Sequence, residues 1–167
     1  TVQGYTVNNK PWEKNMLERE IVTLINSQIT KEFYSAYLYL DFSNYYEIHG
    51  LAGFASWFKI QAKEELDHGL IFSKYLHDNE ESIKLDKIES PDTEIKELMD
   101  PLIASLKHEQ YVTESINKIY ARALELKDFR TTDFLSWFIK EQAEEEKSAQ
   151  MLISKMMLFG NEGKSLY

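Results

Sequence analysis

The sequence lacks cysteine altogether and is poor in the residues that interrupt helices. With no cysteine among 167 residues, disulfides, thiolate zinc sites and iron–sulfur clusters are excluded, so any metal must be bound by carboxylate, amide or imidazole groups. Three prolines and six glycines are few for this length, which favours long helices. No apolar run approaches the roughly 20 residues that span a bilayer, and the first residues show no signal peptide. We therefore expect no membrane partner.

Basic residues are also in the minority. There are 19 lysines and arginines against 28 aspartates and glutamates, which gives a net charge of −9 at pH 7. This balance argues against a nucleic-acid-binding protein, because such a protein needs a basic face to neutralise phosphates. It suits a protein that handles cations. Hydrophobic residues make up 43% of the chain, enough for one domain with a substantial core.

The few glycines and prolines divide the chain into four predicted helices. These helices cover residues 16–47, 51–78, 93–127 and 132–159, the last ending at Gly160 as a C-cap. Pro101 falls in the third helix, either in its first turn or at a kink. Short turns make helices one and two, and helices three and four, antiparallel hairpins. The link over residues 79–91 reaches about 40 Å when extended, nearly the length of a helix. The predicted fold is all-α: a four-helix bundle with one long crossover between helices two and three.

Each predicted helix has one inward-facing seam that is apolar at both ends and polar in the middle. The polar middle positions are Gln28, Glu32 and Ser35; Gln61, Glu65 and His68; Glu109; and Gln142 and Glu145. A buried carboxylate without a partner is unfavourable, and four that face one another would repel or become protonated. We infer that a cation shares the centre of the bundle.

The two predicted hairpins repeat one pattern of polar residues. The matched positions are Glu32, Glu65 and His68 in the first hairpin and Glu109, Gln142 and Glu145 in the second. In each hairpin the first two positions are 33 residues apart, and the third follows three residues later on the same helical face. The offset between the hairpins is then 77 residues; an offset of 80 would align two Ser-Trp-Phe segments but would leave Glu32 without a counterpart. This internal symmetry predicts a two-metal site on the axis of the bundle.

From about Met16 to Tyr167 the chain resembles a non-haem ferritin of the bacterial type. The segments that carry the resemblance are Glu32 with Tyr39, residues 62–69 (AKEELDHG), residues 108–110 (HEQ) and residues 134–146 (FLSWFIKEQAEEE). One Glu-x-x-His motif is weak evidence, because chance often produces it in helices, but six matched positions on inward seams are specific. The resemblance leaves residues 1–15 as an N-terminal extension and residues 16–167 as a ferritin-like di-iron domain, without the family's short fifth helix after Leu166 and Tyr167.

The resemblance implies iron storage and detoxification, with Fe²⁺ oxidised to Fe³⁺ by O₂ or H₂O₂ at a di-iron ferroxidase centre. The implied iron ligands are Glu32, Glu65, His68, Glu109, Gln142 and Glu145, with Glu65 bridging the two irons and Tyr39 beside them. Three further residues match a third, looser iron site: Glu64, Glu141 and Glu144.

Two departures from haem-containing relatives refine this expectation. Leu66 stands where those relatives place the methionine that binds haem, so no haem is expected. Gln142-x-x-Glu145 replaces a second Glu-x-x-His motif, which suggests a second iron position that passes iron on to the store.

The resemblance also implies a cytoplasmic homo-oligomer of 24 subunits that forms a hollow shell. Two alternatives remain open. The first is a plain bundle whose polar seam only sets register, although register needs one or two polar residues rather than six. The second is a di-iron peroxidase or oxygenase, which would need a substrate pocket. Outside the six matched positions, His49, His77 and His108 are expected to be solvated.

Overall fold

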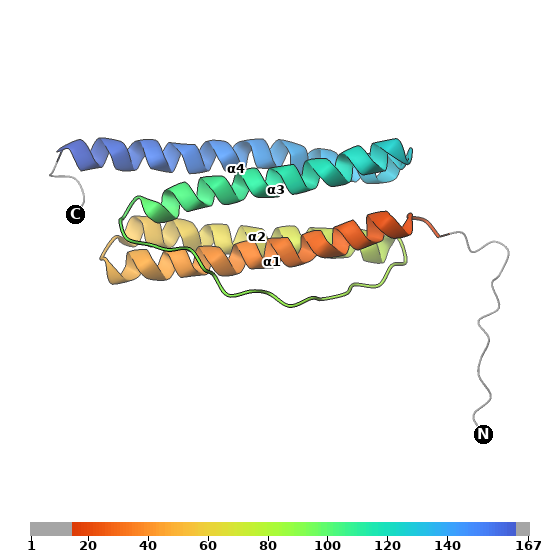
Figure 1. Cartoon of the computed structure of the whole chain (residues 1–167), viewed down its shortest axis with the longest axis horizontal. Coiled ribbons are helices and arrows are strands. Elements are labelled where there is room, and N and C mark those ends of the chain that lie inside the picture. Colours follow the sequence, from red (N-terminus) through yellow and green to blue (C-terminus); the bar gives the residue numbers. More distant parts are fainter. Residues whose placement is uncertain (1–14, 163–167) are drawn as a thin grey trace, which may run out of the picture.

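The computed structural model describes residues 15–162 and contains four helices, two short turns and one long link (Figure 1). The helices are α1 (Arg19–Ile48), α2 (Ala52–Asp78), α3 (Asp100–Glu125) and α4 (Phe129–Glu162). The predicted all-α, four-helix bundle with one long crossover is therefore confirmed. Most of the predicted extension over residues 1–15, and the residues after which a fifth helix would follow, lie outside the described part of the chain.

The four helices pair as two antiparallel hairpins. α1 packs along α2, α3 packs along α4, and the hairpins meet where α1 contacts α3. The long link runs back beside α1 (Figure 1), where the backbone N–H of Lys84 donates a hydrogen bond to Asn26 Oδ1 at 2.7 Å. Because the link returns the chain to the opposite end of the bundle, α2 and α3 run parallel.

The third helix begins later than the sequence predicts, at Asp100 instead of residue 93. Pro101 lies in its first turn, where its missing N–H group is not needed. The Asp100 carboxylate accepts hydrogen bonds from the backbone N–H groups of Lys96 and Glu97, each at 2.8 Å. These bonds turn the chain just before the helix, so the link extends over residues 79–99.

The prediction that Gly160 caps the fourth helix is wrong, because α4 continues through it to Glu162. Gly50 does end a helix: it has a φ of 72° directly after α1, a left-handed conformation that glycine adopts without steric cost. Gly160 is absent from the described residues with positive φ, and glycine can continue a helix when its backbone stays right-handed.

The core consists of two apolar clusters at opposite ends of the bundle, with a polar band between them. The cluster near the start of α1 includes Ile21, Ile25, Ile29, Phe72, Leu76, Ile116, Leu135 and Phe138. The cluster near its end includes Tyr39, Phe42, Tyr46, Phe58, Leu102, Leu152 and Met156. This arrangement matches the predicted seams, which are apolar at both ends and polar in the middle. Within residues 15–162, none of the helices is apolar over enough of its length to cross a membrane.

One helix contact leaves no room for a side chain. Gly69 on α2 faces Phe33 on α1, and a Cβ atom at this glycine would lie 2.3 Å from Phe33 Cε1. The close approach brings α1 and α2 together one residue after His68. The glycine is therefore needed for packing and not for its conformational freedom.

Replacing Gly69 with alanine would force the Phe33 ring to move. We expect Gly69→Ala to lower the free energy of unfolding by about 1–3 kcal/mol, the usual cost of overpacking, in urea denaturation followed by circular dichroism. Gly53→Ala on the same helix is the control, because nothing lies within 4 Å of a Cβ there. Equal stability of the two variants would contradict the close contact.

Candidate metal centre

All six matched positions lie in the polar band at the middle of the bundle. α1 contributes Glu32, α2 contributes Glu65 and His68, α3 contributes Glu109, and α4 contributes Gln142 and Glu145. None of these side chains is more than 5% exposed. The 33-residue separation within each hairpin thus brings its two helices together at the same level.

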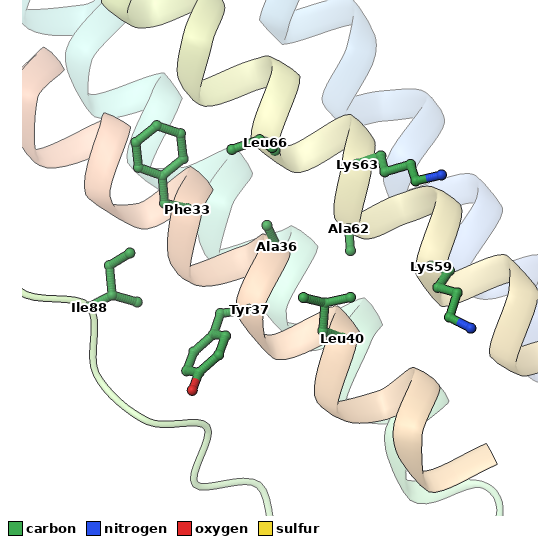
Figure 2. A pocket seen from close by; sticks show the side chains of 9 residues that line it. All are labelled: Phe33, Ala36, Tyr37, Leu40, Lys59, Ala62, Lys63, Leu66 and Ile88. Atoms are coloured by element: carbon green, nitrogen blue, oxygen red, sulfur yellow. The ribbon is translucent and has the colours of Figure 1, made fainter. Parts of the chain in front are cut away.

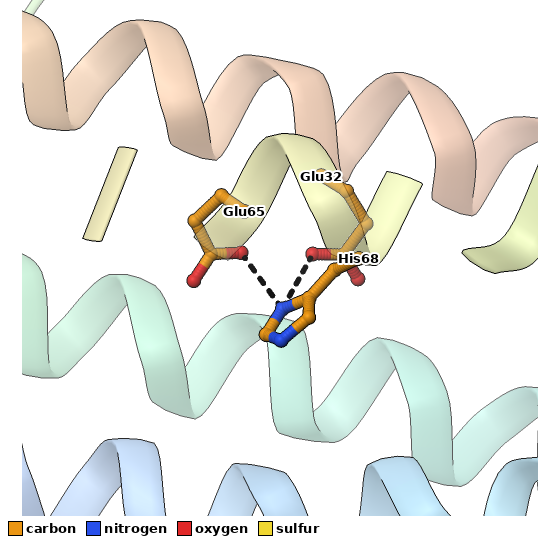
Figure 3. Close-up of side chains that lie close together, drawn as sticks. All are labelled: Glu32, Glu65 and His68. Carbon is orange, nitrogen blue, oxygen red and sulfur yellow. Dashed lines mark ion pairs between the residues drawn. The ribbon is translucent and has the colours of Figure 1, made fainter. Parts of the chain in front are cut away.

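Glu32, Glu65 and His68 form the first group of potential ligands (Figure 3). His68 Nδ1 lies 3.4 Å from Glu65 Oε2 and 4.0 Å from Glu32 Oε2. Among the described residues, the buried side-chain polar atoms that lack a hydrogen-bond partner are Glu32 Oε2, Glu65 Oε1 and His68 Nδ1. Because buried polar atoms are nearly always satisfied, three such atoms in one group fit a metal ion between them. Carboxylate with imidazole suits iron, whereas thiolate would favour softer metals.

Two further groups share members with the first. One contains Glu65, Glu109 and Glu145, and the other contains His68, Glu141 and Glu145; in each, the ligand atoms lie within 4.8 Å of one another. Glu65 therefore belongs to two adjacent groups, as a bridging ligand would. Glu141, from the predicted third site, is half-buried and joins the last group.

The other two residues of the predicted third site are not drawn into the cluster. Glu64 and Glu144 are exposed and belong to none of the potential metal groups found among residues 15–162. They are each one position along the helix from Glu65 and Glu145, which turns their side chains off the seam. Of the third-site residues, only Glu141 is thus placed beside the buried carboxylates.

Amide side chains hold the carboxylates of the second hairpin. Gln142 Nε2 donates to Glu109 Oε2 at 3.0 Å, and Gln61 Nε2 donates to Glu145 Oε2 at 2.7 Å. The Tyr39 hydroxyl donates to the other oxygen of Glu109. Gln142, implied as a ligand by the resemblance, thus acts here as a hydrogen-bond donor that orients Glu109.

Gln28 and Gln61 lie on the predicted inward seams, but their spacing predicts no functional role for them. Gln28 Nε2 donates to Glu32 Oε1 at 2.8 Å, and Gln61 holds Glu145. A signal was present, since each glutamine stands four residues before a carboxylate of its own helix, Glu32 or Glu65. The signal predicts an intrahelical bond in both cases, whereas only Gln28 makes one.

Burial is the main influence on the charge state of the cluster. It raises the pKa of Glu32 and Glu65 well above the usual range, and the charge of a neighbouring glutamate raises each pKa further. Burial followed by the charge of Glu109 raises the pKa of Glu145 to about 7. Without a cation, the cluster therefore retains protons at neutral pH.

His108 is not solvated as the sequence suggested. It is half-buried beside Glu109, and its Nε2 lies 2.6 Å from Ser35 Oγ. The Ser35 hydroxyl donates to the backbone oxygen of Lys31, so the imidazole N–H donates to Ser35. Burial lowers the pKa of His108 to about 4, which keeps the ring neutral. His49 and His77 are exposed as expected.

The cavity beside the cluster is small. It is lined by Tyr39, Phe58, Gln61, Glu109 and Glu145, among others, and its volume is about 10 Å³. That volume is close to the room needed by one water molecule. This cavity therefore has the size of a small inorganic reactant.

Comparison with known proteins gives matches over most of the chain. Residues 22–159 match the family described as the ferritin-like domain. The bacterial non-heme ferritin of Campylobacter jejuni is 36% identical over 152 residues, which cover 91% of this chain and 91% of that protein. The bacterial non-heme ferritin of Escherichia coli is 34% identical, with 91% and 92% covered. Among solved structures, the open-pore ferritin of the archaeon Archaeoglobus fulgidus superimposes with a TM-score of 0.87 at 34% identity, covering 92% of this chain and 93% of that one.

The raised pKa of Glu145 predicts a pH-dependent stability. A carboxyl group with a folded pKa of about 7 and an unfolded value near 4.5 stabilises the fold while protonated, and this contribution is lost as the pH rises toward and through 7. We expect the unfolding midpoint of the metal-free protein to fall by a few degrees between about pH 5 and about pH 8.

Glu145→Gln should flatten this dependence, because the amide cannot ionise. Glu144→Gln is the matched control: Glu144 is the exposed neighbour, and its replacement should leave the pH profile unchanged. Calorimetry at several pH values measures both. Identical profiles for wild type and Glu145→Gln would contradict a raised pKa at this position.

Proposed function

This chain belongs to the ferritin-like family of iron-storage proteins, and on that premise we propose that it oxidises Fe²⁺ to Fe³⁺ at the buried carboxylate cluster before storing it. Residues 16–167 would be the functional domain, and the cytoplasm its location. Two Fe²⁺ ions would each give up one electron. O₂ would accept both electrons and two protons to form H₂O₂, or H₂O₂ would accept them and two protons to form water.

The observation that best supports this proposal is the set of unsatisfied atoms on Glu32, Glu65 and His68. One iron would bind there, and the second would bind between Glu65, Glu109 and Glu145. Glu65 would bridge the two ions, so that both electrons can pass to one oxidant molecule. The carboxylates favour Fe³⁺ over Fe²⁺ because they supply negative charge in a site that excludes water.

The remaining predicted residues would act around these ions. Gln142 and Tyr39 would hold Glu109 by hydrogen bonds, with the Gln142 carbonyl oxygen available as a neutral ligand. Tyr39 would also be able to supply an electron, since its hydroxyl contacts Glu109. Glu141, together with His68 and Glu145, would receive iron that leaves the second position, and the exposed Glu64 and Glu144 would carry it onward.

The two alternative functions receive less support. A bundle whose polar residues only fix register would need its buried polar atoms satisfied, and three of them are not. A di-iron peroxidase or oxygenase would need a substrate pocket at the metal ions, whereas the adjacent cavity measures about 10 Å³.

An apolar groove on the outer face of α1 and α2 supports assembly into an oligomer (Figure 2). The groove measures about 650 Å³ and is lined largely by apolar side chains, including Phe33, Leu40, Leu66 and Ile88. Tyr37, Leu40, Ile60, Leu66 and Leu70 expose 44–53% of their surface along these two helices. Monomeric proteins rarely expose so many large apolar side chains together. We propose a homo-oligomer of 24 subunits forming a hollow shell, and no haem, because Leu66 offers no ligand atom.

Loss of the shared ligands should abolish rapid iron oxidation. We expect Glu65→Ala and His68→Ala each to slow the initial aerobic oxidation of Fe²⁺, followed by the absorbance of Fe³⁺, by more than the roughly 10- to 100-fold typical of residues behind metal ligands. Asp67→Ala is the control, since Asp67 is exposed between the two ligands. Fast oxidation in both ligand variants, with their helical content intact, would refute the assigned centre.

A charge placed in the groove should prevent assembly. We expect Leu66→Glu to reduce the particle from a shell to a small species in light scattering, because the new carboxylate would lose its water at the interface. Leu124→Glu places the same charge at a similarly exposed position on α3, 51% against 47% for Leu66, and should leave a larger particle. A full-sized shell in the Leu66 variant would show that this face is not a subunit contact.

A further inference from the structure

A run of hydrogen bonds leads from the ligand cluster to the surface between α1 and α3. Gln28 Nε2 donates to Glu32 Oε1 at 2.8 Å. Ser115 Oγ on α3 donates to Gln28 Oε1 at 2.7 Å, and Lys31 Nζ on α1 donates to Ser115 Oγ at 2.7 Å. The chain Lys31–Ser115–Gln28–Glu32 therefore connects a lysine at the edge of the bundle to one of the four buried carboxylates.

The direction of every bond in this chain follows from the lysine. An ammonium group can only donate hydrogen bonds, so the Ser115 oxygen must accept from Lys31. The single hydroxyl proton of Ser115 is then free to bond to Gln28 Oε1. Because the amide oxygen of Gln28 is engaged there, its NH₂ group must face Glu32. Each donor thus points toward the carboxylate.

The surroundings strengthen the hydrogen bonds from Lys31 to Glu32 and restrict the movement of the side chains that make them. Gln28 is fully buried and Ser115 is 7% exposed, so water does not compete for these bonds. Hydrogen bonds in series polarise one another where the local dielectric constant is low. Lys31 is half-buried and is also held from the side, with Nζ 5.5 Å from the centre of the Tyr111 ring.

The result at Glu32 is a carboxylate with one oxygen tied and one oxygen free. Oε1 accepts from Gln28, whereas Oε2 has no partner and faces His68 Nδ1 at 4.0 Å. A carboxylate held in this way presents a single oxygen to an ion at a fixed angle. Gln61 and Gln142 also donate hydrogen bonds to buried carboxylates. Within residues 15–162, however, no lysine hydrogen-bonds to a residue that contacts either of these two amides. Among these residues, a lysine therefore stands behind the amide that holds Glu32 and behind neither of the other two.

We propose that Lys31 and Ser115 are positioning residues that lock the Gln28 amide and thereby hold Glu32 in place as a one-oxygen metal ligand. The proposal rests on the proposed metal site and adds a specific device for its first ion. Residues behind metal ligands typically contribute 10- to 100-fold to metal affinity. These hydrogen bonds would therefore fix the position of Glu32 and raise its affinity for the metal ion, in contrast to the carboxylates that would pass iron onward.

The test uses the full chain without iron and Co²⁺ as a redox-inert probe. The affinity for Co²⁺ is measured by competition with a chelator, and the visible absorption bands of bound Co²⁺ report the number and geometry of its ligands. We expect Ser115→Ala and Lys31→Met each to weaken Co²⁺ binding by about 10-fold and to alter the bands. Ser115→Thr, which keeps the hydroxyl, should retain the affinity of the wild type.

Lys118→Met is the matched control. Lys118 lies on α3 close to Ser115, is 71% exposed and pairs only with Glu114 among the described residues. The variant therefore removes a positive charge without altering the hydrogen bonds that connect Lys31 to Glu32. Thermal unfolding checks that all variants fold. Wild-type affinity and bands in Ser115→Ala would overturn the proposal, and so would an equal loss in Lys118→Met, which would point to overall charge.

Failure of the proposed function has a different signature. If Glu65→Ala binds Co²⁺ as the wild type does, the metal site itself is wrong, whatever the Ser115 and Lys31 variants show. If Glu65→Ala loses binding while Ser115→Ala does not, the metal site stands and only the positioning chain is refuted.

Discussion

Four glutamates confined to the middle of the bundle set the constraint on which the rest of the structure depends. Glu32, Glu65, Glu109 and Glu145 are each no more than 5% exposed, so water cannot screen them from one another. Burial and mutual repulsion both oppose their ionised forms, and the raised pKa values of all four follow. The cluster must therefore hold either protons or metal ions, and exchange between these two states is the chemistry that the fold makes available.

A polar centre of this kind weakens the core, and the length of the helices compensates for it. The two apolar clusters lie at opposite ends of the bundle, so each hairpin is stabilised on both sides of the carboxylates. The long link over residues 79–99 matters for the same reason, because it allows the second hairpin to run back over the first with both polar bands at one level. Side chains on four packed helices have little freedom to move, which keeps the four carboxyl groups close together even without an ion.

The sequence predicted this plan well because helical periodicity is a strong signal over long segments. The seams, the crossover and the convergence of Glu32, Glu65, His68, Glu109, Gln142 and Glu145 all follow from spacing. The start of α3 did not, because it depends on how Asp100 binds the preceding backbone. The predicted helix end at Gly160 was wrong because glycine permits a helix to end without requiring it to. Ser115 was out of reach, since its bond to Gln28 joins two helices and leaves no trace in the spacing of either.

Burial is not uniform along the cluster, because one of its ends is less buried than the other. The group of Glu32, Glu65 and His68 is fully buried, the group of Glu65, Glu109 and Glu145 shares one of its members, and the group of His68, Glu141 and Glu145 ends at a half-buried carboxylate. Under the proposed function, an ion that moved between groups with a common ligand would keep that ligand at each step. Glu32 is held from behind by a chain of donors, whereas Glu145 is held by one amide and its pKa of about 7 lets it exchange a proton for an ion at neutral pH. Under the proposed function, the ligands would thus be held most firmly at the inner end and least firmly toward the outer end, which is the order that a site needs if it is to bind iron, oxidise it and release it.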